Sequence, residues 1–154
     1  TQDRILPIAR MSFVLAVLTL LSGGFVAGLD AGMTYNTFPL MDGQLIPEGM
    51  WAMDPIWRNP FENITMVQFD HRVLGISTAV ACLFLWVRAR NADAPPRLAL
   101  AINLTGLMAI AQPALGIMTL LLATPVTLAA AHQTGALILL GMLIWVVTAL
   151  RADP

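Results

Sequence analysis

The sequence predicts an all-α integral membrane protein, folded as an antiparallel bundle of four transmembrane helices. Of its 154 residues, 58% are hydrophobic and 11% are charged, whereas soluble domains have about 45–50% and about 25%. The mean hydropathy is +0.76. Four apolar stretches are each long enough for a helix to cross a bilayer, which takes about 20 residues. These stretches are residues 8–28, 65–87, 98–122 and 126–150.

The connections between the apolar stretches predict how the helices are arranged. Residues 88–97 and 123–125 are short links, and short links join antiparallel neighbours in a bundle. Residues 29–64 form a much longer link than the ~12–15 residues usual for an unstructured loop, so we expect an ordered cap or a functional lid. Its two tryptophans, Trp51 and Trp57, are expected at the level of the lipid headgroups.

The arginines predict the orientation in the membrane. Cytoplasmic links of membrane proteins carry an excess of basic residues, and all eight basic residues here are arginine. Six of them lie near the termini or in the second link: Arg4, Arg10, Arg88, Arg90, Arg97 and Arg151. Both termini are therefore expected to face the cytoplasm. The net charge of −1 provides no basic surface for a nucleic-acid backbone, so nucleic acid is excluded as a partner.

Two histidines are the strongest candidates for a binding site. The stretch 61–75 runs from a polar link into an apolar helix and carries His71, and His132 is the second of the two histidines. Each lies six residues after the start of its helix, at Thr65 or Val126, and so about 9 Å into the membrane. The two helices are expected to lie diagonally across a space of roughly 12–14 Å. Two imidazoles placed in this way could bind one iron atom from opposite sides.

Small residues near these histidines favour a flat ligand. Gly75 follows His71 by four residues and Gly135 follows His132 by three, so each glycine shares a helix face with its histidine. We therefore assign both glycines to the cofactor site. In the alternative interpretation, each histidine only hydrogen-bonds a neighbouring helix. A di-iron bundle site would need Glu-x-x-His, but Gln68 precedes the first histidine by three residues, and two nitrogens alone are too few for zinc.

Several polar residues near the predicted membrane boundary need partners. Arg72 lies in the outer leaflet, where an unpaired charge is costly. We assign it to the cofactor site as a partner of a haem propionate, with Asp70 or Glu62 as the alternative partner. Gln112 is expected to hydrogen-bond a neighbouring helix, with a ligand as the alternative partner. Thr65 is expected to cap the second helix at its N-terminus.

Four segments closely resemble haem A synthase. They are GGFVAGLDAG at 23–32, YNTFPLM at 35–41, FENITMVQFDHR at 61–72 and AHQTG at 131–135. Members of this family have eight helices in two related four-helix bundles, and they oxidise the methyl group of haem O to the formyl group of haem A. The resemblance covers nearly the whole chain, but it corresponds to the C-terminal bundle of the family only.

The resemblance implies a role for each half of the family. The C-terminal bundle holds a haem b between two histidines, at the positions of His71 and His132, and the N-terminal bundle binds the haem O substrate. In that N-terminal bundle a glutamate thought to take part in the oxidation precedes the first histidine by three residues. Gln68 stands at this place here, so no catalytic residue is assigned. The implied partners are membrane lipid, the N-terminal bundle, haem O synthase, cytochrome oxidase assembly factors and a second copy of the chain.

Three functions follow from these observations. The first is the haem b half of haem A synthase in a bacterial cytoplasmic (inner) membrane, transferring electrons. The second is a non-enzymatic cytochrome b-type module that transfers electrons or carries haem. The third is an assembly scaffold with structural histidines. The chain begins at Thr1 with no basic segment typical of a signal peptide, and we expect it to be part of a longer protein.

Overall fold

A computed structural model describes residues 2–90 and 94–152. Four long helices dominate it, and each is long and apolar enough to cross a membrane. Three short helical segments lie in the first link. The long helices are α1 (Gln2–Gly28), α3 (Ile64–Ala89), α4 (Pro96–Leu121) and α5 (Val126–Ala152), and the short ones are η1 (Ala31–Met33), η2 (Ile56–Arg58) and α2 (Asn59–Glu62). The predicted all-α membrane bundle is confirmed.

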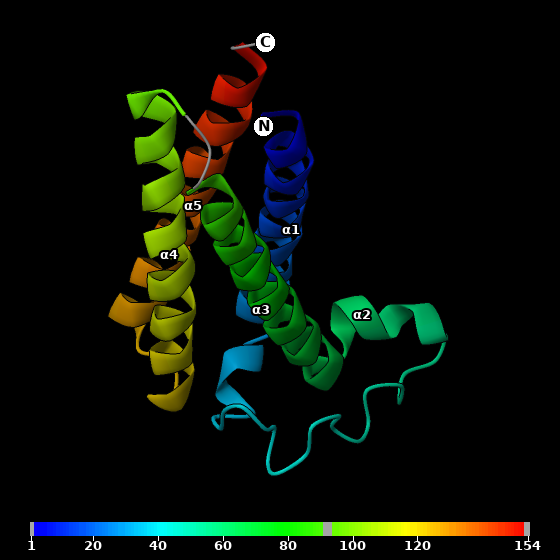
Figure 1. Ribbon diagram of the computed structural model, residues 1–154. Helices are drawn as coiled ribbons and strands as arrows, with labels where there is room; N and C mark the ends of the chain where they lie inside the picture. Colours follow the sequence, from blue (N-terminus) through cyan, green and yellow to red (C-terminus); the bar gives the residue numbers. More distant parts are fainter. Residues whose placement is uncertain (1, 91–93, 153–154) are drawn as a thin grey trace.

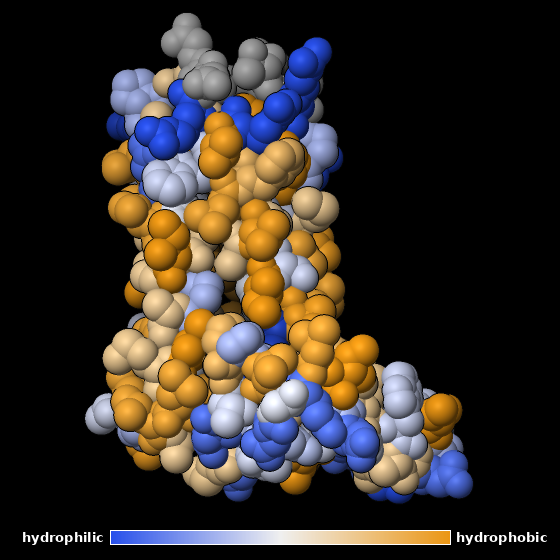
Figure 2. Space-filling model, turned by 60° about the horizontal axis from the view of Figure 1, so that its bottom comes forward, coloured by the Kyte–Doolittle hydropathy of each residue, from blue (hydrophilic) through white to orange (hydrophobic). Residues whose placement is uncertain are grey.

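The four long helices form a ring. Helix α1 packs against α3 and α5, and α4 packs against the same two helices. Helices α3 and α5 are therefore diagonal partners, as the short links predicted. Both chain ends lie at one end of the bundle, and the link between α1 and α3 lies at the other, which we call the outer end (Figure 1). Figure 2 shows a mostly apolar band between two more polar ends, as expected for a protein that spans a bilayer.

The first helix begins earlier than the sequence predicted. Residues 8–28 were expected, whereas α1 starts at Gln2 and includes Pro7. A proline close to the start of a helix removes only one backbone hydrogen bond, so the helix continues through it. The other three long helices begin and end within two residues of the predicted bounds.

The apolar core fills one half of the bundle. Every member of the main buried cluster lies between the termini and the middle of the bundle, and Leu85 and Leu143 are fully buried near its centre. The cluster draws on residues 5–16 of α1, 82–89 of α3, 98–109 of α4 and 139–150 of α5. The two histidines lie in the other half, close to the outer end.

The start of α3 is fixed by a residue other than the predicted one. The side-chain oxygen of Asn63 accepts hydrogen bonds from the backbone nitrogens of Thr65 and Met66, at 3.0 and 3.2 Å. Asn63 is therefore the N-cap, and asparagine is among the residues preferred there. The expectation that Thr65 caps the helix was wrong, because the helix already begins at Ile64. The Thr65 hydroxyl instead lies 3.1 Å from that of Tyr35.

The long first link is ordered, as its length predicted. Asn59 is fully buried, and its side chain bonds the backbone of Met53 and the carbonyl oxygen of Ile56. Helix α2 and the segment before it extend sideways from the outer end of the bundle (Figure 1). Trp51 and Trp57 are 58% and 64% exposed on this extension, and their place at the headgroups stays a prediction.

Candidate functional site

The two histidines face each other inside the outer half of the bundle. The ring centroids of His71 on α3 and His132 on α5 are 6.5 Å apart, and the ring planes are nearly perpendicular, at 89°. One metal bound by both rings would separate the centroids by roughly 6 Å, since each metal–nitrogen bond takes about 2 Å and each ring adds its radius. The observed spacing therefore suits one metal atom held between the two imidazoles.

Helix α1 supports His71 with two consecutive residues. The Oγ atom of Ser22 lies 2.8 Å from Nδ1 of His71. Gly23 comes so close that a Cβ atom there would lie 3.2 Å from the Cε1 atom of the ring. The hydroxyl of Ser22 and the absence of a side chain on Gly23 together set where the imidazole of His71 can lie.

Helix α4 supports His132 in a similar way. The Nε2 atom of Gln112 donates to the main-chain carbonyl oxygen of His132 over 2.5 Å, as expected of an amide that bridges two helices. One turn further along α4, a Cβ atom on Gly116 would lie 2.7 Å from Cε1 of His132. Nδ1 of His132 is buried and has no hydrogen-bond partner among the described residues. A buried polar atom without a partner is uncommon and costly.

The two glycines assigned from the sequence have different surroundings. A Cβ atom at Gly75 would meet no other atom within 4 Å, although Gly75 lies one turn from His71 on the same helix face. Open space beside an inward-facing ligand could receive the edge of a flat ring. A Cβ atom at Gly135 would collide with the side-chain amide of Gln112, so this glycine makes room for the contact between α4 and α5.

Arg72 is held by the outer link. Its guanidinium donates to the carbonyl oxygens of Thr37 and Tyr35, each over 2.8 Å, and to Oε1 of Gln68 over 3.2 Å. The expectation that Asp70 could pair with it was wrong, because link carbonyls lie over the end of α3 and supply the acceptors. Its Nε atom is buried without a partner among the described residues, so this donor of the guanidinium is free.

Glu62, the other predicted acidic partner of Arg72, is engaged elsewhere. It forms a hydrogen-bonded ion pair with Arg58 on the exposed extension, one helical turn away. The Arg58 guanidinium lowers the pKa of the Glu62 carboxyl below its ordinary value. This expectation for Arg72 was therefore also wrong.

The link residues that match the family motifs fasten the cap to the bundle. Gln68 donates to the carbonyl oxygen of Ala31 over 2.8 Å, and Asn36 donates to that of Leu120 at the end of α4 over 2.8 Å. Asp30 adopts a left-handed backbone conformation, with φ of 50°, where η1 begins. The cap over the histidines is therefore tied to both α3 and α4.

The donor set and the space both fit a haem. No three histidine, cysteine or acidic side chains come together in the described part of the chain, so a metal at this site would take two protein nitrogens. That is too few for a zinc site, whereas a haem supplies four ring nitrogens itself. The apolar core ends short of the histidines, and Gly75 faces open space.

Comparison with known proteins decides the family. The sequence model of the COX15-CtaA family, described as cytochrome oxidase assembly protein, matches residues 1–144. The chain belongs to this family. It is 49% identical over 140 residues to Heme A synthase COX15 of Bos taurus, covering 91% of this chain and 34% of that protein. It is 46% identical over 147 residues to Heme A synthase of Nitrosospira multiformis, covering 96% and 41%.

As a member of the COX15-CtaA family, the chain spans between a third and about two fifths of the length of these two relatives, at 34% and 41%. The resemblance to haem A synthase predicted from the four segments is confirmed. No solved structure matches the chain.

Sequence reasoning missed three residues of this COX15-CtaA site. Ser22, Gly23 and Gly116 contact the histidines from neighbouring helices, and their importance depends on how the helices pack. One signal was available, because Gly116 follows Gln112 by four residues and so shares its helix face.

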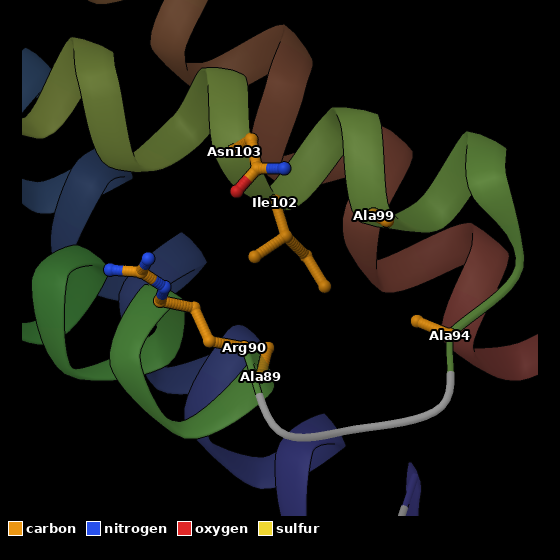
Figure 3. A pocket seen from close by; sticks show the side chains of 6 residues that line it. All are labelled: Ala89, Arg90, Ala94, Ala99, Ile102 and Asn103. Carbon is orange, nitrogen blue, oxygen red and sulfur yellow. The ribbon is translucent and has the colours of Figure 1, made fainter.

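A hollow of about 260 Å³ lies elsewhere, between the last turn of α3 and the first half of α4 (Figure 3). Asn103, one of its lining residues, accepts a hydrogen bond at Oδ1 from Nε1 of Trp86 over 2.8 Å. This hollow is at the end of the bundle nearest the termini and includes neither histidine. It is lined by Ala89, Arg90, Ala94, Ala99, Ile102 and Asn103.

Proposed function

We propose that this chain is the haem-holding bundle of a haem A synthase, the enzyme that oxidises the methyl group of haem O to the formyl group of haem A. One observation carries the proposal: the rings of His71 and His132 face each other at 6.5 Å from diagonal helices. Two similar proteins named Heme A synthase are two to three times longer than this chain. Their additional length leaves room for the N-terminal bundle that would bind haem O.

Each residue of the site has a role in this proposal. His71 and His132 would hold the iron of a haem b. The Nε donor of Arg72, which is buried and free, would bind a propionate at the outer end. Gly75 would leave space for the ring, while Gly135 would keep α4 and α5 close enough for Gln112 to hold the backbone of His132.

A haem held by these two histidines would supply one-electron transfer. The residues of this chain would hold it and shield it from water. The link that Gln68, Asn36 and Arg72 fasten over the outer end is the main barrier to water there.

The same proposal places the protein in a bacterial cytoplasmic membrane. The arginines gathered at the end nearest the termini support a cytoplasmic position for both termini. The partners proposed are the N-terminal bundle, membrane lipid, haem O synthase, cytochrome oxidase assembly factors and a second copy of the chain.

Replacing each histidine by alanine in the full-length parent protein tests the site. We expect His71→Ala and His132→Ala each to remove the b-type signal from a reduced-minus-oxidised absorption spectrum. Gln133→Ala is the matched control, because Gln133 is exposed on α5 beside His132 and should leave the spectrum unchanged. Normal haem b content in both histidine variants would refute the assignment.

Pigment extraction separates the enzyme from a cytochrome b-type module that only transfers electrons or carries haem. In cells that lack their own haem A synthase, the full-length parent protein should restore haem A, and the His71→Ala variant should not. Accumulation of haem O together with a b-type spectrum of the parent protein would favour the non-enzymatic module.

A further inference from the structure

The hydroxyl group of Ser22 lies between two groups with opposite hydrogen-bonding requirements. Its Oγ atom is 2.7 Å from the carbonyl oxygen of Thr19 in the same helix and 2.8 Å from Nδ1 of His71 on α3. A carbonyl oxygen can only accept a hydrogen bond, and a serine hydroxyl has one hydrogen to donate. The hydroxyl hydrogen therefore goes to Thr19, and the same oxygen accepts a hydrogen from Nδ1 of His71.

This direction decides which nitrogen of His71 can bind a metal. A neutral imidazole carries one hydrogen, so a hydrogen on Nδ1 leaves the lone pair of Nε2 free. A histidine ligand that donates its other N–H to a neighbouring group has a fixed ring orientation and a more basic ligating nitrogen. His132 has no such side-chain neighbour among the described residues, and the hydrogen-bonding group beside its ring is the backbone of Gln112.

We propose that Ser22 is the positioning residue of His71, and that the two histidines would be unequal ligands because no side chain plays the same part for His132 among the described residues. Ser22 fixes the tautomer that presents Nε2 to the iron and makes His71 the more basic ligand. The proposal rests on the proposed haem-holding function. It adds that haem binding by His71 depends on Ser22, a residue of α1.

The test is Ser22→Ala in the full-length parent protein with haem b bound. Without the acceptor at Nδ1, His71 becomes a weaker donor to ferric iron, so we expect the midpoint reduction potential to rise. The g values of the low-spin electron paramagnetic resonance signal should shift as well. Haem affinity should fall by about 10- to 100-fold, the usual cost of losing such a partner. Ser22→Thr keeps the hydroxyl and should restore the parent values.

Thr78→Val is the matched control. The Oγ1 atom of Thr78 lies 2.7 Å from that of Thr19, so this variant removes a hydroxyl contact between α1 and α3 at a distance from His71 along the helix. Potential and g values should stay at the parent values. Equal changes in Thr78→Val and Ser22→Ala would overturn the proposal, because the effect would then belong to helix packing.

The remaining outcomes are also decisive. If haem b is lost from Ser22→Ala but kept by Ser22→Thr and Thr78→Val, the proposal is supported. If Ser22→Ala retains haem b with the potential and g values of the parent, the proposal is overturned while the haem-holding function stands. A parent protein that holds no haem b would overturn both.

Discussion

Gln112 of α4 donates its side-chain hydrogen to the main-chain carbonyl oxygen of His132 on α5, 2.5 Å away. One turn along the same face of α4, Gly116 lies against the imidazole itself. The position of His132 is thus set from α4 at both its backbone and its ring. His71 is positioned from α1 at its ring, through Ser22 and Gly23.

Gly116→Ala should displace His132. The added Cβ atom would lie 2.7 Å from Cε1 of the ring, and added bulk in a packed site typically costs about 1–3 kcal/mol. We expect a lower ratio of haem b to protein and a changed electron paramagnetic resonance signal. Gly141→Ala is the control, because a Cβ atom there meets nothing within 4 Å. An unchanged haem ratio and signal in Gly116→Ala would show that the ring is not confined there.

Arg72→Ala should loosen the cap. The variant removes two hydrogen bonds from a charged donor to the carbonyl oxygens of Thr37 and Tyr35, and such bonds contribute about 1.5–3 kcal/mol each. Amide hydrogen exchange in residues 35–41 should become faster, measured by mass spectrometry. Arg58→Ala, on the exposed extension, should leave this exchange as it is. Equal protection of the segment in the parent protein and Arg72→Ala would rule out this anchoring role.

Asn63→Ala should destabilise the start of α3 more than Thr65→Ala does. Loss of an N-cap costs about 0.5–2 kcal/mol, and Asn63 also donates to the carbonyl oxygen of Gly49 over 2.8 Å. Thr65→Ala removes only the contact with the Tyr35 hydroxyl. Thermal unfolding in mild detergent should rank the variants in this order. The opposite order would indicate that Thr65 is the N-cap of α3.

Acidification should weaken the contact between Arg58 and Glu62. Hydrogen bonding to Arg58 lowers the pKa of Glu62 from its ordinary value of 4.5. A carboxyl with a lowered pKa stabilises the fold fully above the ordinary value, and this contribution is lost as the pH falls through the lowered pKa. Fluorescence of Trp57, next to Arg58, should therefore change below pH 4.5. Glu62→Gln should abolish that change, and persistence of the change in Glu62→Gln would assign it to another group.

The four helices could be predicted from the sequence because hydrophobic length is a local property, readable without knowing any contact. The position of His71 and His132 near the start of their helices was predicted by the same reasoning. The partners of the two histidines could not be predicted, since Ser22 and Gly116 acquire their roles only when α1 meets α3 and α4 meets α5.

The partner of Arg72 shows a second limit of sequence reasoning. A charge in an apolar region suggests an opposite charge, yet the structure provides main-chain carbonyls from a link more than thirty residues away, with separations of 35 and 37 residues. Any residue has a carbonyl, so no side-chain pattern marks these acceptors. Motif residues such as Asn36 are explained only by the structure, which ties its side chain to Leu120.

The restriction of the apolar core to one half of the bundle has a consequence for assembly. In a membrane, close packing between helices holds a bundle together, and here that packing joins the helices at the end nearest the termini. The outer half is therefore joined to a half of the bundle that is already packed. A broad, flat molecule could enter by a small spreading of α1, α3, α4 and α5 at the outer end, with no helix unwinding. The hydrogen bonds of Gln68 and Asn36 hold the link across this end of the bundle.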